Sequence, residues 1–488
     1  MSSARSLLRK GLALLPLFTA FLSAESFAAP PPITIQASGD DAVPTSPGVF
    51  GFVAGIDRSS ALLGDMWGLR TALSQYGITL TIQDTSEYLG NLSGGVQRGF
   101  VYEGLTQVVA QVDTQRAFGH YGGLFNVSAL NIRGGNLSAQ NLLTLQTASG
   151  IEADRGTRLW EAWYDQKFLD EDRLDVKIGQ QSLDQEFMVS SNALYFVNTM
   201  FGWPMLPSAD LPGGGPAYPL SALGVRVAAR PVNGVTLLAG VFDGDPVKND
   251  DGSDPQQQNR HGTSFPLNGG ALYIAEAQFS YPAVGSMVEP GQQKALGWTY
   301  RVGAWYDTRN FADMRMDENG IPLANPLSDG NPRQHSGNYA FYGVADRLVW
   351  RDDEYPDRTI AFFTRIMGTP QQDRNLINFS ANVGLVMHSP FRNRPGDTFG
   401  IGGGYARVSN SVTQSDVDTI AFTGQSQPLR TNEKFVELTY QYQWKPWIQI
   451  QPDLQYVWNP GAGVSNPDYP WLRVKNVLVV GVRTNISF

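Results

Sequence analysis

The residues of this chain that could do chemistry are polar and aromatic side chains that alternate with apolar ones. In the segment 157–169, an apolar set alternates with a polar set: Trp160, Ala162, Tyr164 and Phe168 against Glu161, Trp163, Asp165 and Lys167. Because residues two apart share one face of a strand, this segment has an apolar face and a charged face that includes one tryptophan. The Trp163 ring could stack on a passing solute or pack against an inserted loop, and both interpretations stay open.

The same alternation places further polar groups on the equivalent face of other segments. In 173–184, Asp175, Lys177 and Gln181 lie opposite Leu174, Val176 and Ile178. In 221–229, Arg226 lies opposite Val225 and Val227, and in 296–309 the polar face carries Arg301, Trp305, Asp307 and Arg309. Mixed charges and aromatic rings at such spacing suit reversible contacts with a solute rather than bond-making.

Neither a catalytic set nor a complete metal site is evident. The four histidines, His120, His261, His335 and His388, are scattered, and the chain contains neither Gly-x-Ser-x-Gly nor HExxH. Asp250, Asp251 and Asp254 resemble part of a calcium loop but lack the full spacing and a closing glutamate. We therefore predict no enzyme activity and no cofactor or metal, with a loop calcium as the lesser alternative.

The elements that carry these residues are strands, because the hydrophobic period is two from Ile78 onward. Sixteen candidate strands lie at 78–90, 99–113, 122–134, 157–169, 173–184, 221–229, 235–243, 270–282, 296–309, 338–351, 357–369, 378–388, 397–409, 431–444, 446–459 and 474–488. Short joins alternate almost regularly with long Gly-, Pro-, Asn- and Asp-rich ones, such as 135–156, 185–220, 310–337 and 410–430. A soluble sandwich has no reason to segregate loop lengths in this way. The pattern predicts a sixteen-stranded antiparallel transmembrane β-barrel with short periplasmic turns and long outer loops.

The 185–220 connection is the expected constriction. It carries Glu186, Phe201, Trp203 and the hinge LPGGGPAYP, with Asp184 at its base, and we predict that it folds inward. A surface loop is the alternative. The residues that we select as substrate-binding or pore-lining are Glu161, Trp163, Asp165, Gln181, Asp184, Glu186, Phe201, Trp203, Arg226, Arg301, Trp305 and Arg365.

Both termini fit an exported barrel. Residues 1–28 have a basic start, an apolar centre and a small-x-small end, which predicts a secretory signal peptide. We expect a flexible periplasmic leader at 29–58, a short amphipathic helix at 59–77 and the barrel at 78–488. The last strand ends on Phe488, a terminal aromatic that we expect the barrel assembly machinery to engage. The predicted location is the bacterial outer membrane, with its lipid around the barrel.

The charge and composition of the chain argue against several classes of binding partner. The chain has 36 basic and 45 acidic residues, a net charge of −9, which argues against nucleic acid and against a pore dedicated to phosphate-like anions. It has no cysteine, so no disulfide holds it together. Its mean hydropathy of −0.22 is compatible with a membrane protein only if each spanning segment contacts lipid with just one of its two faces.

Several strings resemble the carbohydrate-selective outer-membrane porin family of the OprB type. They include DMWGLRTALSQYGI at 65–78, NTMFGWPMLPSADLPGGGPAYPLSALGVR at 198–226, FYGVADRLVW at 341–350 and VELTYQYQWKPWIQIQPDLQYVWNPG at 436–461. The resemblance implies a sixteen-stranded monomer that passes monosaccharides, glucose above all, down their gradient. One departure is Arg347, where members usually have glutamine, and it could shift substrate preference if that position faces the lumen.

The expected function is therefore a passive channel selective for monosaccharides. Sugars are neutral and ringed with hydroxyls, so a selective pore needs aromatic faces and polar groups that exchange for water. A general porin, or one for organic acids or amino acids, is the first alternative, and an outer-membrane barrel enzyme is the second. An organic-acid pore predicts a net basic constriction, whereas the candidates here are mixed in sign.

Overall fold

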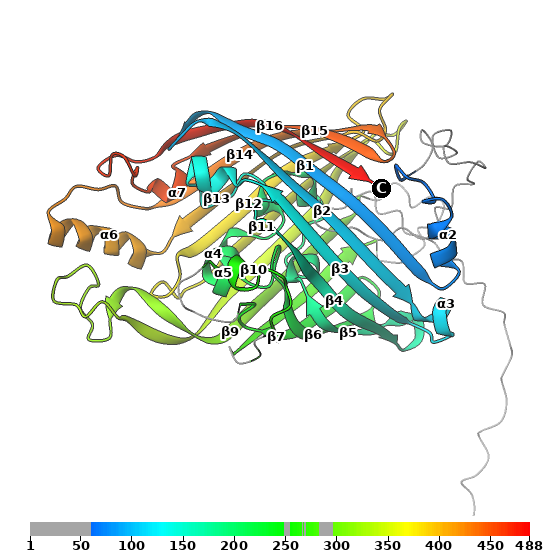
Figure 1. The fold of residues 1–488 in the computed structure, drawn as a ribbon, viewed down its shortest axis with the longest axis horizontal. Helices are drawn as coiled ribbons and strands as arrows, with labels where there is room; N and C mark the ends of the chain where they lie inside the picture. The colour runs from blue at the N-terminus through cyan, green and yellow to red at the C-terminus, as the bar shows by residue number, and fades with distance from the viewer. Residues whose placement is uncertain (1–59, 248–253, 266, 268–269, 283–295) are drawn as a thin grey trace, which may run out of the picture.

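The protein is a closed antiparallel barrel in a computed structural model that describes residues 60–247, 254–265, 267, 270–282 and 296–488 (Figure 1). Each strand pairs with its neighbour in sequence, and β1 pairs with β16, so no edge is left open. In these described residues the sixteen strands are β1 Ile78–Gly95, β2 Gly99–Asp113, β3 Gly123–Gly134, β4 Gly156–Phe168, β5 Leu174–Gln181, β6 Ala222–Val232, β7 Val235–Asp243, β8 Ala271–Tyr281, β9 Trp298–Asp317, β10 Pro332–Arg351, β11 Thr359–Gly368, β12 Ile377–His388, β13 Thr398–Val408, β14 Asn432–Lys445, β15 Ile448–Trp458 and β16 Lys475–Ser487. The predicted fold class is confirmed.

The helices are short and lie in the connections. The α-helices are α2 Leu69–Ser74, α3 Thr114–Phe118, α4 Met205–Asp210, α5 Pro255–Gln258, α6 Asn410–Thr423 and α7 Pro460–Gly463. Single turns of 3-10 or π-helix lie at η1 Ser138–Leu142, η2 Asp170–Asp172, η3 Leu183–Gln185, η4 Ala193–Tyr195, η5 Thr199–Phe201 and η6 Pro212–Gly214. Among the helices of the described ranges, none has the length and apolarity to span a membrane.

Alternation directs apolar side chains outward and polar ones inward. On β14, Leu438 is 36% exposed while its neighbour Glu437 is fully buried, and on β16 exposed Val482 precedes buried Arg483. Aromatic residues near strand ends, such as Trp350 and Trp458, are exposed on the outer surface, as expected for rings at the membrane–water boundary. The predicted inner faces of β5 and β6 are also as observed, with Lys177 and Arg226 buried and Ile178 exposed.

The prediction is wrong at Trp160, which was assigned to the lipid face. The ladder between β3 and β4 shifts register where Ser128 pairs with Glu161 and Ala129 with Leu159, so Trp160 is an extra residue in a bulge. A bulge reverses the alternation. Trp160 is therefore buried to 1% exposure and packs against Tyr218 of the β5–β6 connection.

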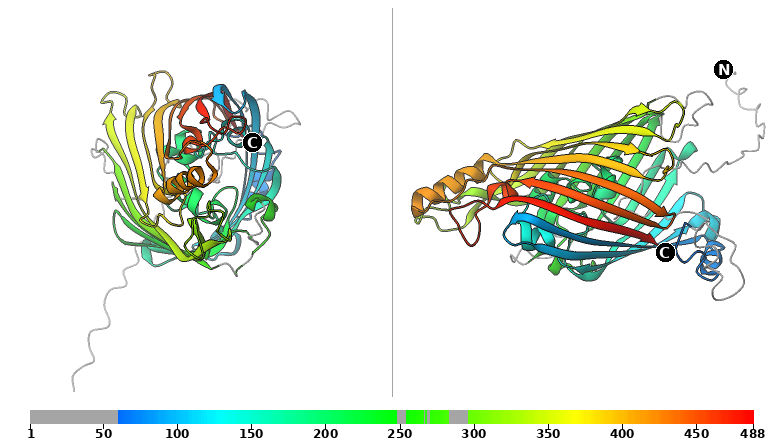
Figure 2. Two further views of the ribbon diagram at one scale, coloured as in Figure 1. Left: turned by 90° about the vertical axis from the view of Figure 1, so that its left-hand side faces the viewer. Right: turned by 90° about the horizontal axis from the view of Figure 1, so that it is seen from above.

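The two ends of the barrel differ, as the loop lengths predicted. The short turns, α2, α3 and the C-terminus lie at one end, and α6 projects from the other (Figures 1 and 2). Much of the predicted loop 310–337 is strand instead, because β9 and β10 extend as one long hairpin. Most of the predicted loop 410–430 is α6.

The helix predicted for 59–77 is reduced to the six residues of α2. Met66, Trp67 and Gly68 have φ values of 49°, 57° and 94°, a left-handed backbone that cannot continue a right-handed helix. The predicted signal peptide and leader, and Asp250 and Asp251, lie outside the described residues.

Candidate functional site

The β5–β6 connection, residues 182–221, lies inside the barrel and is bonded to its wall. Asp346 on β10 accepts hydrogen bonds from the Ser190 hydroxyl at 2.7 Å and from the Asn192 backbone N–H at 3.2 Å. Glu437 on β14 accepts from the backbone N–H groups of Val197 and Asn198 at 2.6 and 3.0 Å. Because β10 and β14 are far from β5 in the strand order, the connection crosses the lumen.

Arg365 on β11 is the most heavily bonded anchor of this connection. Its guanidinium donates to the carbonyl oxygens of Met188 at 3.0 Å, Gly202 at 2.8 Å and Met200. It also reaches Asn382 Oδ1 on β12 at 3.3 Å. Arg365, selected as a lumen residue, therefore does point inward, but its side chain is 1% exposed and is used to hold the connection.

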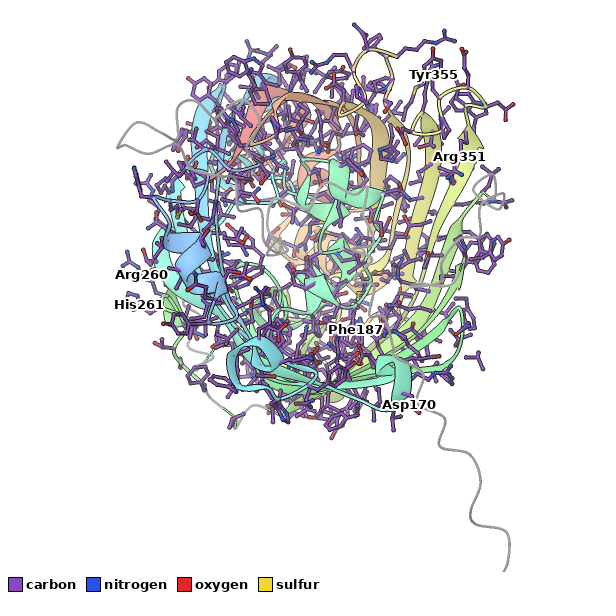
Figure 3. All side chains as sticks on the ribbon, turned by 90° about the vertical axis from the view of Figure 1, so that its right-hand side faces the viewer. Asp170, Phe187, Arg260, His261, Arg351 and Tyr355 are labelled. Atoms are coloured by element: carbon purple, nitrogen blue, oxygen red, sulfur yellow. The ribbon has the colours of Figure 1, made fainter. Side chains whose placement is uncertain are left out.

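The connection has its own aromatic core. Phe201 stacks on Phe196 with ring centroids 4.3 Å apart and packs edge-on against Phe363 and Phe435 of the wall. Figure 3, viewed along the barrel from the end with the short turns, places Phe187 within the ring of strands. Phe201 and Trp203, selected as possible binding rings, are 1% and 6% exposed and are packing residues of this core. The Trp203 indole donates to Gly214 O at 2.9 Å, which fixes the hinge.

A second connection, between β3 and β4, also folds inward. Glu433 on β14 accepts from the N–H groups of Leu145 and Gln146 at 2.9 and 2.7 Å, and Gly150 N donates to Val197 O at 2.9 Å. This connection was predicted as an ordinary outer loop. Burial raises the pKa of its Glu152 to about 8, although two hydrogen bonds from Ser138 oppose the shift.

Four of the selected residues come together at the inner wall of β4, β5 and β6, namely Trp163, Asp165, Glu186 and Arg226. Asp165 pairs across the ladder with Lys177, and Lys177 pairs with Arg226, so the three lie in one row. Arg226 forms ion pairs with Asp175, with Asp165 at 3.8 Å and with Glu186 of the connection at 3.2 Å. Lys177 also pairs with Glu186. We call Asp165, Asp175, Lys177, Glu186 and Arg226 the ionic cluster.

Trp163 is the aromatic member of this site. Its cross-strand partner is Gly179, whose φ of 134° and lack of a side chain leave room for the indole. A Cβ at Gly179 would lie 2.7 Å from the Trp163 Cα. The Lys177 ammonium lies 4.3 Å from the indole ring centroid, a cation–π contact that covers part of the ring. Trp163 thus contacts a charged wall residue rather than the core of the inserted connection.

Three more selected residues hold the base of the connection beside the cluster. Glu161 accepts from Ser182 N at 3.0 Å, and the Gln181 amide donates to Gly224 O at 3.1 Å. Asp184 accepts from the Ser182 hydroxyl at 2.6 Å and from Tyr218 N at 3.3 Å. Burial raises the pKa of Asp184 against these hydrogen bonds. Three of these four hydrogen bonds are to backbone groups, so the three side chains hold the base of the connection in place beside the cluster.

The remaining two selected residues lie on β9, three strands further round the barrel from β6. Arg301 on β9 forms an ion pair with Asp346 at 3.0 Å and lies 3.9 Å from Glu276. Trp305 is 2% exposed within the central hydrophobic core, so it is a packing residue and not an exposed platform. The selected residues therefore fall into three groups: those at the ionic cluster, those that hold the base of the connection beside it, and those that anchor or pack the inside of the barrel.

Comparison with known proteins assigns the family. Residues 97–488 match the family model described as "Carbohydrate-selective porin, OprB family". The chain belongs to the OprB family. Porin B of Pseudomonas aeruginosa is 25% identical over 460 residues, which cover 88% of this chain and 92% of the relative. A protein of Acinetobacter baylyi with the name "Putative porin QuiX" is 24% identical over 437 residues, covering 84% and 91%.

Among solved structures, the high-pH structure of Pseudomonas putida OprB has the same fold. The TM-score is 0.76 at 24% identity, over 88% of this chain and 99% of that one. This OprB-family porin is therefore a carbohydrate channel of the bacterial outer membrane, and not an enzyme. The predicted resemblance is confirmed.

The departure from the family pattern at Arg347 does not reach the lumen of this OprB-family porin. Arg347 is exposed and directly follows buried Asp346, so the two side chains point to opposite faces of β10. The outward position removes the reason to expect a shift in substrate preference from this residue.

Several functional residues were missed by sequence reasoning. Lys177 and Asp175 were expected on the inner face but were not selected, and Glu276 and Glu433 were not considered. Glu276 accepts from Met188 N at 2.8 Å and from the Tyr342 hydroxyl at 2.9 Å. Glu276 and Glu433 could have been found in the sequence as carboxylates on the polar face of a strand. At such a position only a buried partner can compensate the negative charge.

Of the acidic loop, the structure describes Asp254 but not Asp250 and Asp251, so the loop calcium stays a prediction. No group of three or more potential ligands occurs among the described residues. Asp254 caps α5 by accepting from Gln256 N at 2.8 Å.

Proposed function

We propose that this OprB-family porin passes monosaccharides such as glucose by facilitated diffusion and selects them at the ionic cluster. The observation that carries the proposal is the pairing of charges: Arg226 and Lys177 each contact carboxylates. Paired charges present donors and acceptors together, which suits hydroxyl groups that both donate and accept. An organic ion would instead have to separate existing ion pairs to bind.

The net negative charge of the ionic cluster argues against a pore for organic acids. It contains three carboxylates, Asp165, Asp175 and Glu186, against two cations, Lys177 and Arg226. A pore for anionic solutes is expected to have a net basic constriction. The Trp163 indole adds an apolar surface beside the charges, which fits the C–H face of a pyranose ring.

We also propose that one chain is a complete channel. The β5–β6 connection is bonded to strands of its own barrel, and the cluster uses β4, β5, β6 and Glu186 of the same chain. A monomer therefore supplies every group that the selection mechanism uses.

The test is liposome swelling with the purified porin and four solutes: glucose, a disaccharide, an amino acid and a dicarboxylate. We expect glucose to enter fastest. Trp163→Ala should lower the ratio of glucose to disaccharide entry about twofold to tenfold, the equivalent of one lost aromatic contact. Trp444→Ala, at an exposed tryptophan on the outer surface, is the matched control.

Other outcomes discriminate against the proposal. Equal entry of all four solutes would indicate a general pore, and faster entry of the dicarboxylate would indicate an organic-acid pore. An unchanged ratio in folded Trp163→Ala would remove the indole from the selection mechanism.

A further inference from the structure

An apolar hollow lies on the outer surface of the barrel, away from the lumen. It has a volume of about 600 Å³ and is lined mainly by outward-facing side chains of β6 to β10, five strands that lie side by side in the wall. Four of its lining residues are 44% to 58% exposed: Val241, Tyr273, Tyr306 and Phe341. The hollow is therefore open to whatever surrounds the barrel. We call it the outer hollow.

The floor of the outer hollow is a row of three small residues. Ala239 on β7 pairs with Ala275 on β8, and Ala275 pairs with Ala304 on β9. Val227 on β6 and Phe341 on β10 continue the row and form its two sides. Neighbouring strands are about 4.8 Å apart, so the floor extends roughly 10 Å around the barrel with only methyl groups on it. The hollow thus arises from the size of the side chains in one row of the sheet.

A row of larger side chains bounds the outer hollow toward the long-loop end of the barrel. Tyr273 pairs with Tyr306, and Tyr306 pairs with Tyr339. The apolar outward run of β9 ends at Tyr306, because the next residue on this face is Thr308, which is exposed and polar. Tyrosine rings collect at the boundary between hydrocarbon and head groups. The tyrosine row therefore marks the outer edge of the apolar band, and the hollow lies directly beneath it.

The shape and chemistry of the outer hollow fit one chain of a membrane lipid. An apolar groove that ends at tyrosine rings matches an acyl chain that ends at a polar head group. The rings of Tyr339 and Phe341, with centroids 5.7 Å apart, pack against each other and form one continuous side of the groove along β10.

A second copy of the porin fits the outer hollow less well. In a two-fold contact the same patch meets itself. The hollow of one copy would then face the hollow of the other, and the void between them would lack packing contacts. A flexible acyl chain can fill the hollow without this mismatch.

We propose that the outer hollow is a binding site for one acyl chain of a lipid in the outer leaflet, with the head group of that lipid at the tyrosine row. Bulk lipid is as apolar as the hollow, so the hydrophobic effect does not favour this site over the rest of the barrel surface. The preference arises from van der Waals contacts, since a chain between two sides touches more atoms than a chain on a smooth surface. The site consists of outward side chains and does not depend on which solute the lumen passes.

The test uses native mass spectrometry of the purified porin in detergent, which reports the bound lipid and the number of protein chains in one measurement. The probes are a long-chain saturated phosphatidylglycerol and a short-chain phosphatidylglycerol with the same head group. Ala275→Phe fills the floor of the outer hollow. Ala381→Phe is the matched control, because Ala381 on β12 pairs with exposed Ile366, faces outward and does not line the hollow. Heat-dependent mobility in gels verifies that each barrel is folded.

We expect the wild-type monomer to retain one long-chain lipid. Ala275→Phe should weaken this binding about fivefold, because the phenyl ring takes the place of several chain contacts, and Ala381→Phe should bind as the wild type does. Equal binding of the long-chain lipid by the two folded variants would overturn the proposal. Equal retention of the short-chain and long-chain lipids would also overturn it, since the head group alone would then account for binding. A wild-type oligomer that Ala275→Phe dissociates would assign the hollow to a second copy instead.

Discussion

Replacement of Arg365 by alanine should loosen the β5–β6 connection without opening the barrel. The guanidinium donates to three carbonyl oxygens of the connection, at Met188, Met200 and Gly202. Alanine leaves these buried acceptors without their donor. The backbone ladders of β11 with β10 and β12 involve no Arg365 side-chain atom, so strand pairing should persist.

The magnitude follows from the number of acceptors. Each buried acceptor left unsatisfied costs about 1–3 kcal/mol, so three cost about 3–9 kcal/mol. The aromatic contacts of Phe196 and Phe201 with the wall remain, as do the bonds to Glu437. We therefore expect the segment 188–202 to shift locally, with the connection still inside the lumen.

The assay is single-channel conductance in planar bilayers together with liposome swelling. Folded Arg365→Ala should show higher or more variable conductance and a smaller preference for glucose over a disaccharide. Arg392→Ala is the control, because Arg392 lies on a short turn and its side chain is 61% exposed. Wild-type conductance and wild-type discrimination in Arg365→Ala would refute the prediction that the anchored connection forms the constriction.

Two further predictions concern charge and pH. Glu186→Gln removes the carboxylate that Lys177 and Arg226 share, so the reversal potential in a salt gradient should shift toward anion preference; Glu354→Gln, at an exposed turn residue, should cause no shift. Burial raises the pKa of Glu152 from 4.5 to about 8, so the folded protein binds this proton more tightly than the unfolded chain. Its stabilising effect is complete below pH 4.5 and is lost as pH rises toward about 8. Relative to Glu152→Gln, wild-type porin should lose thermal stability between pH 5 and pH 9, and parallel melting temperatures for the two proteins would contradict this.

The strands were predictable because their signal is local. In β14 the alternation of Glu437 and Gln441 with Leu438 and Tyr440 gives both the strand and its two faces. The same reasoning identified the inner positions of Lys177 and Arg226. The alternation gave the wrong face for Trp160, because the bulge there arises from the pairing of β4 with β3. No residue type within β4 indicates the bulge.

The candidate site was predictable only in part. Trp163, Asp165, Glu186 and Arg226 were selected and do meet, because cross-strand neighbours on one inner face are close whatever else fills the lumen. Phe201, Trp203 and Trp305 were selected as binding rings, yet they are buried in packing. Composition shows that a ring is present, but whether a solute can reach it depends on what the inserted connection covers.

The sequence by itself determined the period of two, the segregation of short and long connections and the resemblance to one porin family, and these suffice for a sixteen-stranded barrel. Only the tertiary structure decided the route of the β5–β6 connection across the lumen and the identity of its anchors. Glu437, for example, bonds Val197 across 240 positions of sequence. Backbone periodicity is a property of neighbouring residues, whereas contacts across a lumen depend on strand register and loop path together, which no local pattern encodes.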